Sequence, residues 1–336
     1  MYQTSGGGKT YVPLERGHSF FGSSTPRLAK MIGWKYAHLP GSVVVSDFAE
    51  NHQRFLSKTL VQDVADRVGE LISEHESEWT YSLPESINAK DVATISIGRD
   101  GTCMPMLPKG WREAMCGTIS LFDAKGERLH TIYQACAPEY GKKTFEYLFT
   151  HDIKSIKKKF PTAQTVGVAD GAIDNWTFLG KYVQQCILDF YHATTYLAKV
   201  AEKLPDHNKK QKKKWLDDRC HQLKNDEDAA KEIYKEVEEL KNKDGSPMSD
   251  DESVKSMLTY FNNHIHMMDY ADYQSQNLPI GSGVTEAACK IIVKQRLGLS
   301  GMRWSINGTN SQLILRTLCL TDGRWKQVWT KITTLN

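Results

Sequence analysis

The spacing of hydrophobic residues changes near residue 91, and the change separates a helical region from the chain that follows. In 57–72 (SKTLVQDVADRVGELI), apolar residues such as Leu60, Val64 and Val68 recur every three or four positions, which is typical of an amphipathic helix. A second helical pattern begins at 25–39 with a Thr followed by Pro. The sequence therefore predicts a helical N-terminal region over 1–90. Two short helices joined by a turn could dock on DNA, but we favour a small bundle that packs on the next domain.

After residue 91, short runs of alternating or β-branched residues predict strands. The first three predicted strands are 93–98 (ATISIG), 115–122 (MCGTISLF) and 128–135 (RLHTIYQA). Three helices and two strands are predicted to follow in alternation: a helix at 142–160, a strand at 163–170, a helix at 175–183, a strand at 185–189 and a helix at 190–204. Three consecutive strands suit an antiparallel meander, and strands that alternate with helices suit parallel crossovers. We therefore expect an α/β fold with a mixed sheet covered by helices.

Charge dominates the next part of the chain. Segments such as HNKKQKKKW and KEIYKEVEELKNKDG mix both signs at helical spacing, which indicates solvated helices. An apolar helical pattern returns behind a Gly-Ser-Gly turn, and QLILRTLCL predicts another buried helix near the end. We divide the chain into a helical region (1–90), a first part of a core (91–204), an all-helical insertion (205–275) and a second part of the core (276–336).

Composition narrows the class of protein. The 336 residues have a formal net charge of only +3, so any nucleic-acid site is a local patch. The seven cysteines include no CxxC pair, which favours reduced thiols inside a cell over a disulfide scaffold or a structural zinc site. No apolar run is long enough to span a membrane, so we expect a cytoplasmic protein with no membrane partner. The segment Gly6–Thr10 (GGGKT) imitates a phosphate loop but lacks its first glycine.

Three acidic residues are candidates for a metal site. Asp100 and Asp170 each come at the predicted end of a strand and before a glycine, and Glu286 lies in the first turn of the predicted helix after Gly-Ser-Gly. Sites form at strand ends in α/β sheets, and Mg²⁺ takes carboxylates together with phosphate oxygens. The alternative for each Asp is a capped turn before Gly, which is common.

Other polar residues are candidates for supporting roles. Asp189 and His192 form a D-x-x-H at the start of a helix. His192 either steadies a phosphate or a catalytic loop or is hydrogen-bonded in the core, and for Asp189 we favour the role of helix N-cap. A basic and aromatic set can hold DNA phosphates and stack on a base: Lys290, Lys294, Arg296, Arg303 and Trp304. The alternative is a surface helix end followed by a core Trp. The two histidines His264 and His266 are too close in sequence to share one side of a helix, so zinc binding there is not expected.

The sequence resembles the bacterial insertion-sequence transposases of the ISKra type, which belong to the broad group with an Asp-Asp-Glu triad. The matching stretches cover most of residues 91–316: ISIGRDGT, GWREAMCGTISLFDAKGERLHTIYQACAPEYGKKTF, VGVADGAIDNW, ILDFYHATTYL, LPIGSGVTEAACK and RLGLSGMRWS. The resemblance implies a ribonuclease-H-like mixed sheet flanked by helices, with a helical insertion between the second and third acids. It also implies that Asp100, Asp170 and Glu286 bind Mg²⁺, with Mn²⁺ as a substitute, and that Asp189–His192 is the family's C/D-x-x-H motif.

The resemblance leads to a functional expectation. An active transposase of this kind would cut and join DNA at element ends by two-metal phosphoryl transfer, as a homodimer or larger assembly associated with the nucleoid. A domesticated protein of the same fold would bind DNA without strand transfer, and a structure-selective nuclease would cut branched DNA without joining it.

Overall fold

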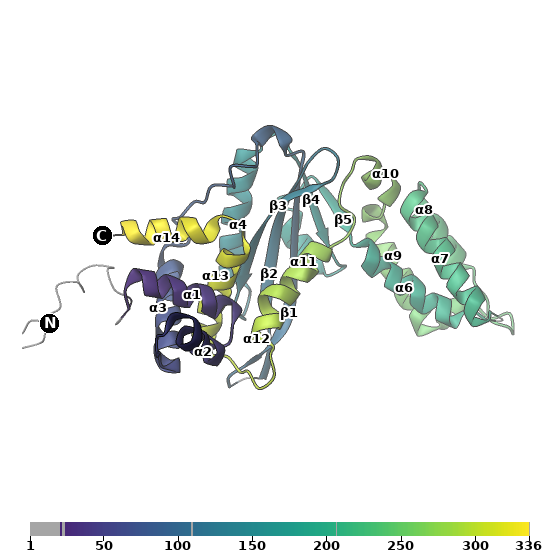
Figure 1. The fold of residues 1–336 in the computed structure, drawn as a ribbon. Helices are drawn as coiled ribbons and strands as arrows, with labels where there is room; N and C mark the ends of the chain where they lie inside the picture. Colours follow the sequence, from purple (N-terminus) through teal and green to yellow (C-terminus); the bar gives the residue numbers. More distant parts are fainter. Residues whose placement is uncertain (1–20, 22–23, 109, 206, 336) are drawn as a thin grey trace, which may run out of the picture.

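A mixed β-sheet lies at the centre of the molecule, between two groups of helices (Figure 1). The computed structural model describes residues 21, 24–108, 110–205 and 207–335, so the segment Gly6–Thr10 lies outside the described residues. The strands are β1 (Thr94–Met106), β2 (Gly110–Phe122), β3 (Arg128–Cys136), β4 (Gln164–Ala169) and β5 (Gln185–Leu188). Their order is β3-β2-β1-β4-β5. β2 is antiparallel to both β1 and β3, whereas β4 is parallel to both β1 and β5. The predicted α/β fold, with a meander followed by parallel crossovers, is confirmed.

The first two strands are longer than predicted, and this corrects the expected place of Asp100. β1 continues to Met106, where it pairs with Gly110 of β2, whereas β4 pairs only with residues 94–97 of β1. Asp100 therefore lies inside β1 and not at its end. It comes just beyond the point where β1 loses its parallel neighbour. The prediction missed the extension because the β1–β2 arm carries mixed polar residues and Pro105, which hide the strand pattern.

Helices cover both faces of the sheet. One face packs against α4 (Lys143–Lys159) and α5 (Ile173–Leu179) through a cluster that includes Ile95, Phe149 and Phe178. The other face, with Met104, Ala114 and Cys116, packs against α11 (Gly283–Ala288), the π-helical turn η6 (Cys289–Lys294), α12 (Gln295–Leu297) and α13 (Ile306–Leu320). Because side chains alternate along a strand, the two neighbours Arg99 and Asp100 point to opposite faces.

The N-terminal helices pack on the C-terminal ones. They are α1 (Pro26–His38), α2 (Gly41–His52) and α3 (Lys58–His75), and they share one hydrophobic cluster with α13 and α14 (Arg324–Thr334). Thr25 and Ser57 cap α1 and α3, because their hydroxyl groups accept hydrogen bonds from the first turns of these helices. The favoured interpretation, a helical bundle packed on the rest of the chain, describes this region.

The segment 205–275 is helical and lies beyond β5 at the far side from the N-terminal bundle (Figure 1). It contains α7 (Lys209–Asn225), α8 (Ala229–Glu238), α9 (Glu252–His264) and α10 (Tyr270–Ser275), which share a cluster with β4, β5 and α6 (Phe190–Lys203). Short 3₁₀ turns occur at η3 (Ala89–Asp91), η4 (Met248–Asp250) and η5 (Ile265–Met267). In the described part of the chain, every helix is too short or too polar to cross a bilayer.

Candidate active site

A close contact between β1 and α11 positions the third acid. A Cβ atom on Gly98 would lie 2.1 Å from the hydroxyl of Thr285, so only glycine allows the helix to approach the strand this closely. The hydroxyl groups of Thr285 and Thr118 on β2 are 2.7 Å apart and buried. These contacts hold the start of α11 against the sheet. Glu286, the next residue, is thereby brought to the same face of β1 as Asp100.

Asp100 is half-buried at this contact. Its Oδ1 accepts a hydrogen bond of 2.7 Å from the backbone N–H of Gly101, and the thiol of Cys289 lies 3.6 Å from its Oδ2. Burial raises the pKa of Asp100, the Gly101 hydrogen bond opposes this, and the negative charge of Asp170 raises the pKa further. Asp100 and Asp170 are thus close enough to repel each other.

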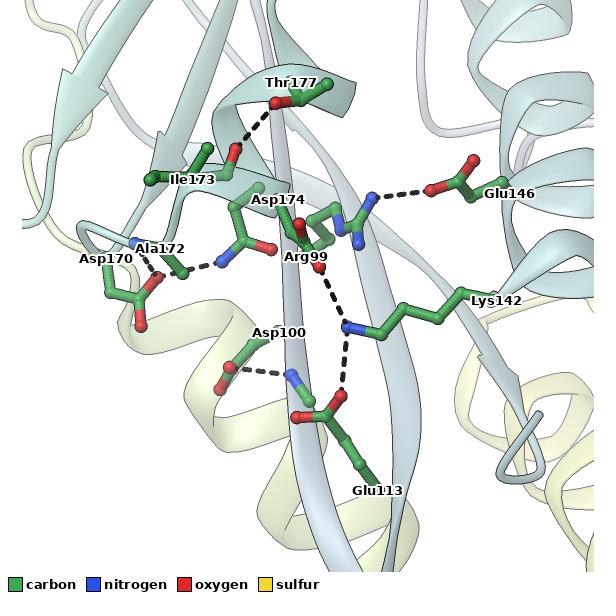
Figure 2. A network of polar contacts seen from close by, with 12 residues as sticks. Arg99, Asp100, Glu113, Lys142, Glu146, Asp170, Ala172, Ile173, Asp174 and Thr177 are labelled. Atoms are coloured by element: carbon green, nitrogen blue, oxygen red, sulfur yellow. Dashed lines mark hydrogen bonds and ion pairs between the residues drawn. The ribbon is translucent and has the colours of Figure 1, made fainter. Parts of the chain in front are cut away.

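Asp170 follows β4, as predicted, and its carboxylate is held by the chain after it. Its Oδ1 accepts from the backbone N–H of Ala172 (3.1 Å) and from Nδ2 of Asn175 (2.9 Å). Figure 2 shows Asp100 and Asp170 on the same side of the strands, next to the pale green helical ribbon. Asp170 therefore makes the contact two residues on that the turn-cap alternative predicts, whereas Asp100 lies inside β1 and bonds the N–H of the next residue.

Gly171 brings the helical insertion against this turn. A Cβ there would lie 2.4 Å from the ring of Tyr260 on α9, so the ring packs directly on the backbone beside Asp170. A cavity of about 850 Å³ lies next to this contact, between α5, α6 and α9. The glycine after Asp170 is required by this packing of helix α9.

Asp100 and Glu286 share a second cavity of about 670 Å³. Its lining also includes Lys290 and Lys294, so two carboxylates and two ammonium groups face one space. Asp170 does not line this cavity, and among the described residues no three His, Cys, Asp or Glu side chains form a ready-made metal site. Mg²⁺ in phosphoryl-transfer sites is bound by one or two carboxylates together with substrate phosphates and not by an all-protein cage. The oxygen donors of this open arrangement fit such an ion.

The D-x-x-H residues have structural partners. Asp189 is 1% exposed, and its Oδ1 accepts from the backbone N–H groups of Tyr191 (2.8 Å) and His192 (3.3 Å) at the start of α6. The favoured role as N-cap is thus confirmed. The ring of His192 packs against Tyr196 and Tyr260, with ring centroids 5.8 and 5.9 Å apart. The ring is half-buried, so it packs against the core edge as the alternative expects, but among the described residues it lacks the hydrogen bond that this alternative included.

The predicted basic set divides into surface and core residues. Lys290, Lys294 and Arg303 are exposed, and the first two line the cavity of Asp100. For Arg296 the prediction of DNA contact is wrong, because its side chain is 1% exposed and donates to the carbonyl of Tyr36 and to Gln312.

Trp304 is also turned inward. Its Nε1 donates to the carbonyl of Leu297 (3.0 Å), and its ring lies 5.3 Å from the guanidinium of Arg296. The half-buried ring covers a buried cation, which favours the core-Trp alternative over stacking on a base.

The sequence interpretation missed several residues that shape the site. Ser282, Thr285 and Cys289 contact the candidate acids or hold their helix in place. On the opposite face of β1, Arg99 pairs with Glu146 (3.2 Å), and Lys142 bridges Glu113 and Asp174 (Figure 2). The Gly-Ser-Gly turn signalled a loop, but the partners of these side chains are up to 189 positions away and leave no local pattern.

Comparisons with known proteins give no family or relative, so a functional assignment rests on the geometry of the site. No protein-family model matches the chain, and no curated protein matches it significantly.

Proposed function

We propose that this chain is a DDE-type transposase that cuts and joins DNA at insertion-sequence ends on a ribonuclease-H-like core. One observation carries the proposal: Asp100 and Glu286 face one cavity that also contains Lys290 and Lys294, and Asp170 lies within electrostatic reach of Asp100. The acids come from β1, from the end of β4 and from α11. The strand order expected from the sequence likewise puts the first acid on the first strand, the second on the fourth strand and the third on a late helix, and this order supports the ribonuclease-H-like core.

Each residue of the site has a role in this proposal. Asp100, Asp170 and Glu286 would hold Mg²⁺ or Mn²⁺, which would neutralise the phosphate and activate water. Lys290 and Lys294 hold DNA phosphates beside the acids. The chain acts by position and charge and needs no covalent nucleophile. Because two element ends are joined, the active form is a homodimer or a larger assembly on DNA.

A cleavage assay tests the proposal. The purified chain is incubated with Mg²⁺ and a supercoiled plasmid that carries the element ends, and nicked, cut and joined products are measured. Asp100→Asn and Glu286→Gln should each lower cleavage by at least about 10²–10³-fold, because each removes charge at the reacting phosphate. Asp174→Asn is the matched control, since Asp174 is exposed on α5 and pairs only with Lys142 among the ion pairs of the described chain.

The outcomes separate the alternatives. Parent-level cleavage by Asp100→Asn would contradict the triad. Binding of the ends without cleavage in Mg²⁺ or Mn²⁺ would indicate a domesticated DNA-binding protein. Cutting of branched DNA without joining would indicate a structure-selective nuclease.

A further inference from the structure

The loop before α11 is attached to the start of α6, far away in the sequence. The backbone N–H of Phe190 donates to the carbonyl of Ile280 (2.9 Å), and a Cβ on Gly281 would lie 3.1 Å from the ring of Tyr191. The hydroxyl of Ser282 donates to Oδ2 of Asp189. Three consecutive loop residues therefore contact residues 189–191 before the chain enters α11.

Ser282 occupies a position where serine ordinarily caps a helix. An N-cap hydroxyl accepts a hydrogen bond from the second or third N–H of its own helix. Here the hydroxyl makes no such bond to a described N–H of α11 and is turned to Asp189 instead. The Ser282 hydroxyl therefore makes a tertiary hydrogen bond to Asp189 in place of the local bond that would cap α11.

The surroundings of Asp189 explain why it attracts this hydroxyl. The Asp189 side chain is buried, and its Oδ1 already accepts two backbone N–H bonds. A carboxylate this deeply buried requires donors on both oxygens. The hydroxyl of Ser282 supplies the donor for Oδ2.

The same hydroxyl also donates to Oε1 of Glu286 at 3.0 Å. Ser282 thus lies between two carboxylates, one buried and one at the edge of the cavity that Asp100 also lines. Because a serine hydroxyl has one proton, it serves the two carboxylates in turn or shares the proton between them. The hydroxyl links Glu286 to Asp189, and the other lone pairs of Glu286 stay available for a cation in the cavity.

We propose that Ser282 is a positioning residue, which couples the buried carboxylate of Asp189 to Glu286 and sets the place and direction of the Glu286 side chain. The inference rests on the proposed function, because it assigns Glu286 to a divalent-cation site. It also gives Asp189 a second role beyond the cap of α6: through Ser282, the first residue of the D-x-x-H motif orients the third acid.

The test compares four full-length proteins without DNA: the parent, Ser282→Ala, Ser282→Thr and Ser305→Ala. Ser305 is the control because its hydroxyl also lies at a helix start, where it accepts from the N–H of Gly308 at 3.2 Å on α13. Hydrogen–deuterium exchange is measured over 283–288 and over 306–320, and Mn²⁺ binding is measured by calorimetry.

Ser282→Ala should accelerate exchange over 283–288 by about tenfold and leave 306–320 unchanged, since it frees the start of α11 alone. It should also weaken Mn²⁺ binding by about 10–100-fold, the usual effect of removing a group that orients a metal ligand. Ser282→Thr keeps a hydroxyl and should recover Mn²⁺ affinity at least in part. Ser305→Ala should accelerate exchange over 306–320 alone and bind Mn²⁺ like the parent.

Parent-like exchange over 283–288 in Ser282→Ala would overturn the inference, and so would parent-like Mn²⁺ affinity in that variant. If the parent itself binds no Mn²⁺, the proposed function fails. In that case the exchange result alone decides whether Ser282 positions α11.

Discussion

At the scale of single residues, the site depends on contacts that leave no space for one more atom. Gly98 is the clearest case, because a methyl group there would overlap the hydroxyl of Thr285 and approach that of Thr118 to 3.1 Å. Both hydroxyl groups are buried and bonded to each other, so neither can move aside freely. Gly98 is therefore a condition for the position of α11.

We predict that Gly98→Ala moves α11 away from β1. Overpacking of this kind costs about 1–3 kcal/mol of folding free energy, and displacement of Glu286 should lower DNA cleavage by about 10²-fold. Urea denaturation and the plasmid assay measure the two effects. Gly283→Ala is the control, since no described atom lies within 4 Å of a Cβ at that exposed position. Equal stability of the two variants would contradict the steric argument.

Residue types alone did not separate the surface cations from the buried ones. Lys294 and Arg296 are two positions apart, yet the first lines a cavity and the second is buried among Tyr36, Gln312 and Trp304. The π-helical turn just before α12 changes which side chains face inward. The helical period of the sequence does not reveal such a turn, so the direction of Arg296 could not be predicted.

At the scale of elements, the end of α3 meets β3, α4 and α14 around one acidic side chain. Burial raises the pKa of Glu76 to about 7, and the negative charge of Asp152 on α4 acts in the same direction. The hydrogen bond from Gln134 (3.5 Å) and the charge of Arg324 oppose it. Glu76 thus binds its proton more tightly in the folded protein than in the unfolded chain, where its pKa is near 4.5.

We predict that the protein loses stability as pH rises through 7. The contribution of Glu76 is complete below pH 4.5, because both states are then protonated, and it is lost as the folded state ionises. The loss amounts to up to about 3 kcal/mol. Urea denaturation at pH 5 and pH 8 measures it in the parent and in Glu76→Gln, where the loss should be smaller by that amount. Glu74→Gln, an exposed change on the same helix, should behave like the parent. An identical pH dependence in all three proteins would contradict the prediction.

Elements with one strong pattern were predicted well, and elements with a mixed pattern were not. The helix predicted over 142–160 is observed as α4, and the strand predicted over 163–170 is observed as β4, within one residue at each end. The α4 segment is buried along one face and shows a helical period, whereas β4 is buried on both faces and shows a continuous apolar run. In the outer part of the β1–β2 arm, residues 102–106 pair with 110–114 without a third strand and expose residues such as Trp111, so the sequence there has no clean alternation.

At the scale of the whole molecule, the helical segments pack around one central sheet. The N-terminal bundle packs on α13 and α14, the segment 205–275 packs beyond β5, and α11 brings the chain back to β1. Acids separated by 186 positions of sequence can therefore act together only if the long helical segment folds as a unit beside the sheet. The predicted order of strands and helices anticipated this topology, but the contacts of Tyr260 and Ser282 that join the parts depend on tertiary packing.

The distribution of charge at this scale predicts where DNA lies. Lys290 and Lys294 are exposed beside the acidic pair, whereas Lys209 and Lys210 are exposed on α7 in a lysine-rich run of the helical segment. If DNA phosphates occupy the cavity, the double change Lys290→Ala, Lys294→Ala removes two phosphate contacts. The slope of log affinity against log salt should then become shallower by about 2, since each contact contributes about 0.9.

The same double change on α7, Lys209→Ala with Lys210→Ala, is the matched control, and fluorescence anisotropy with end DNA at several salt concentrations measures both pairs. A solvated lysine face makes no phosphate contact, so the α7 pair should keep the slope of the parent. A shallower slope in the α7 variant with a parent-like slope in the cavity variant would place DNA on the helical segment, away from Asp100 and Glu286. In that case, DNA bound by the helical segment of one chain would be cut by the acids of another chain in the assembly.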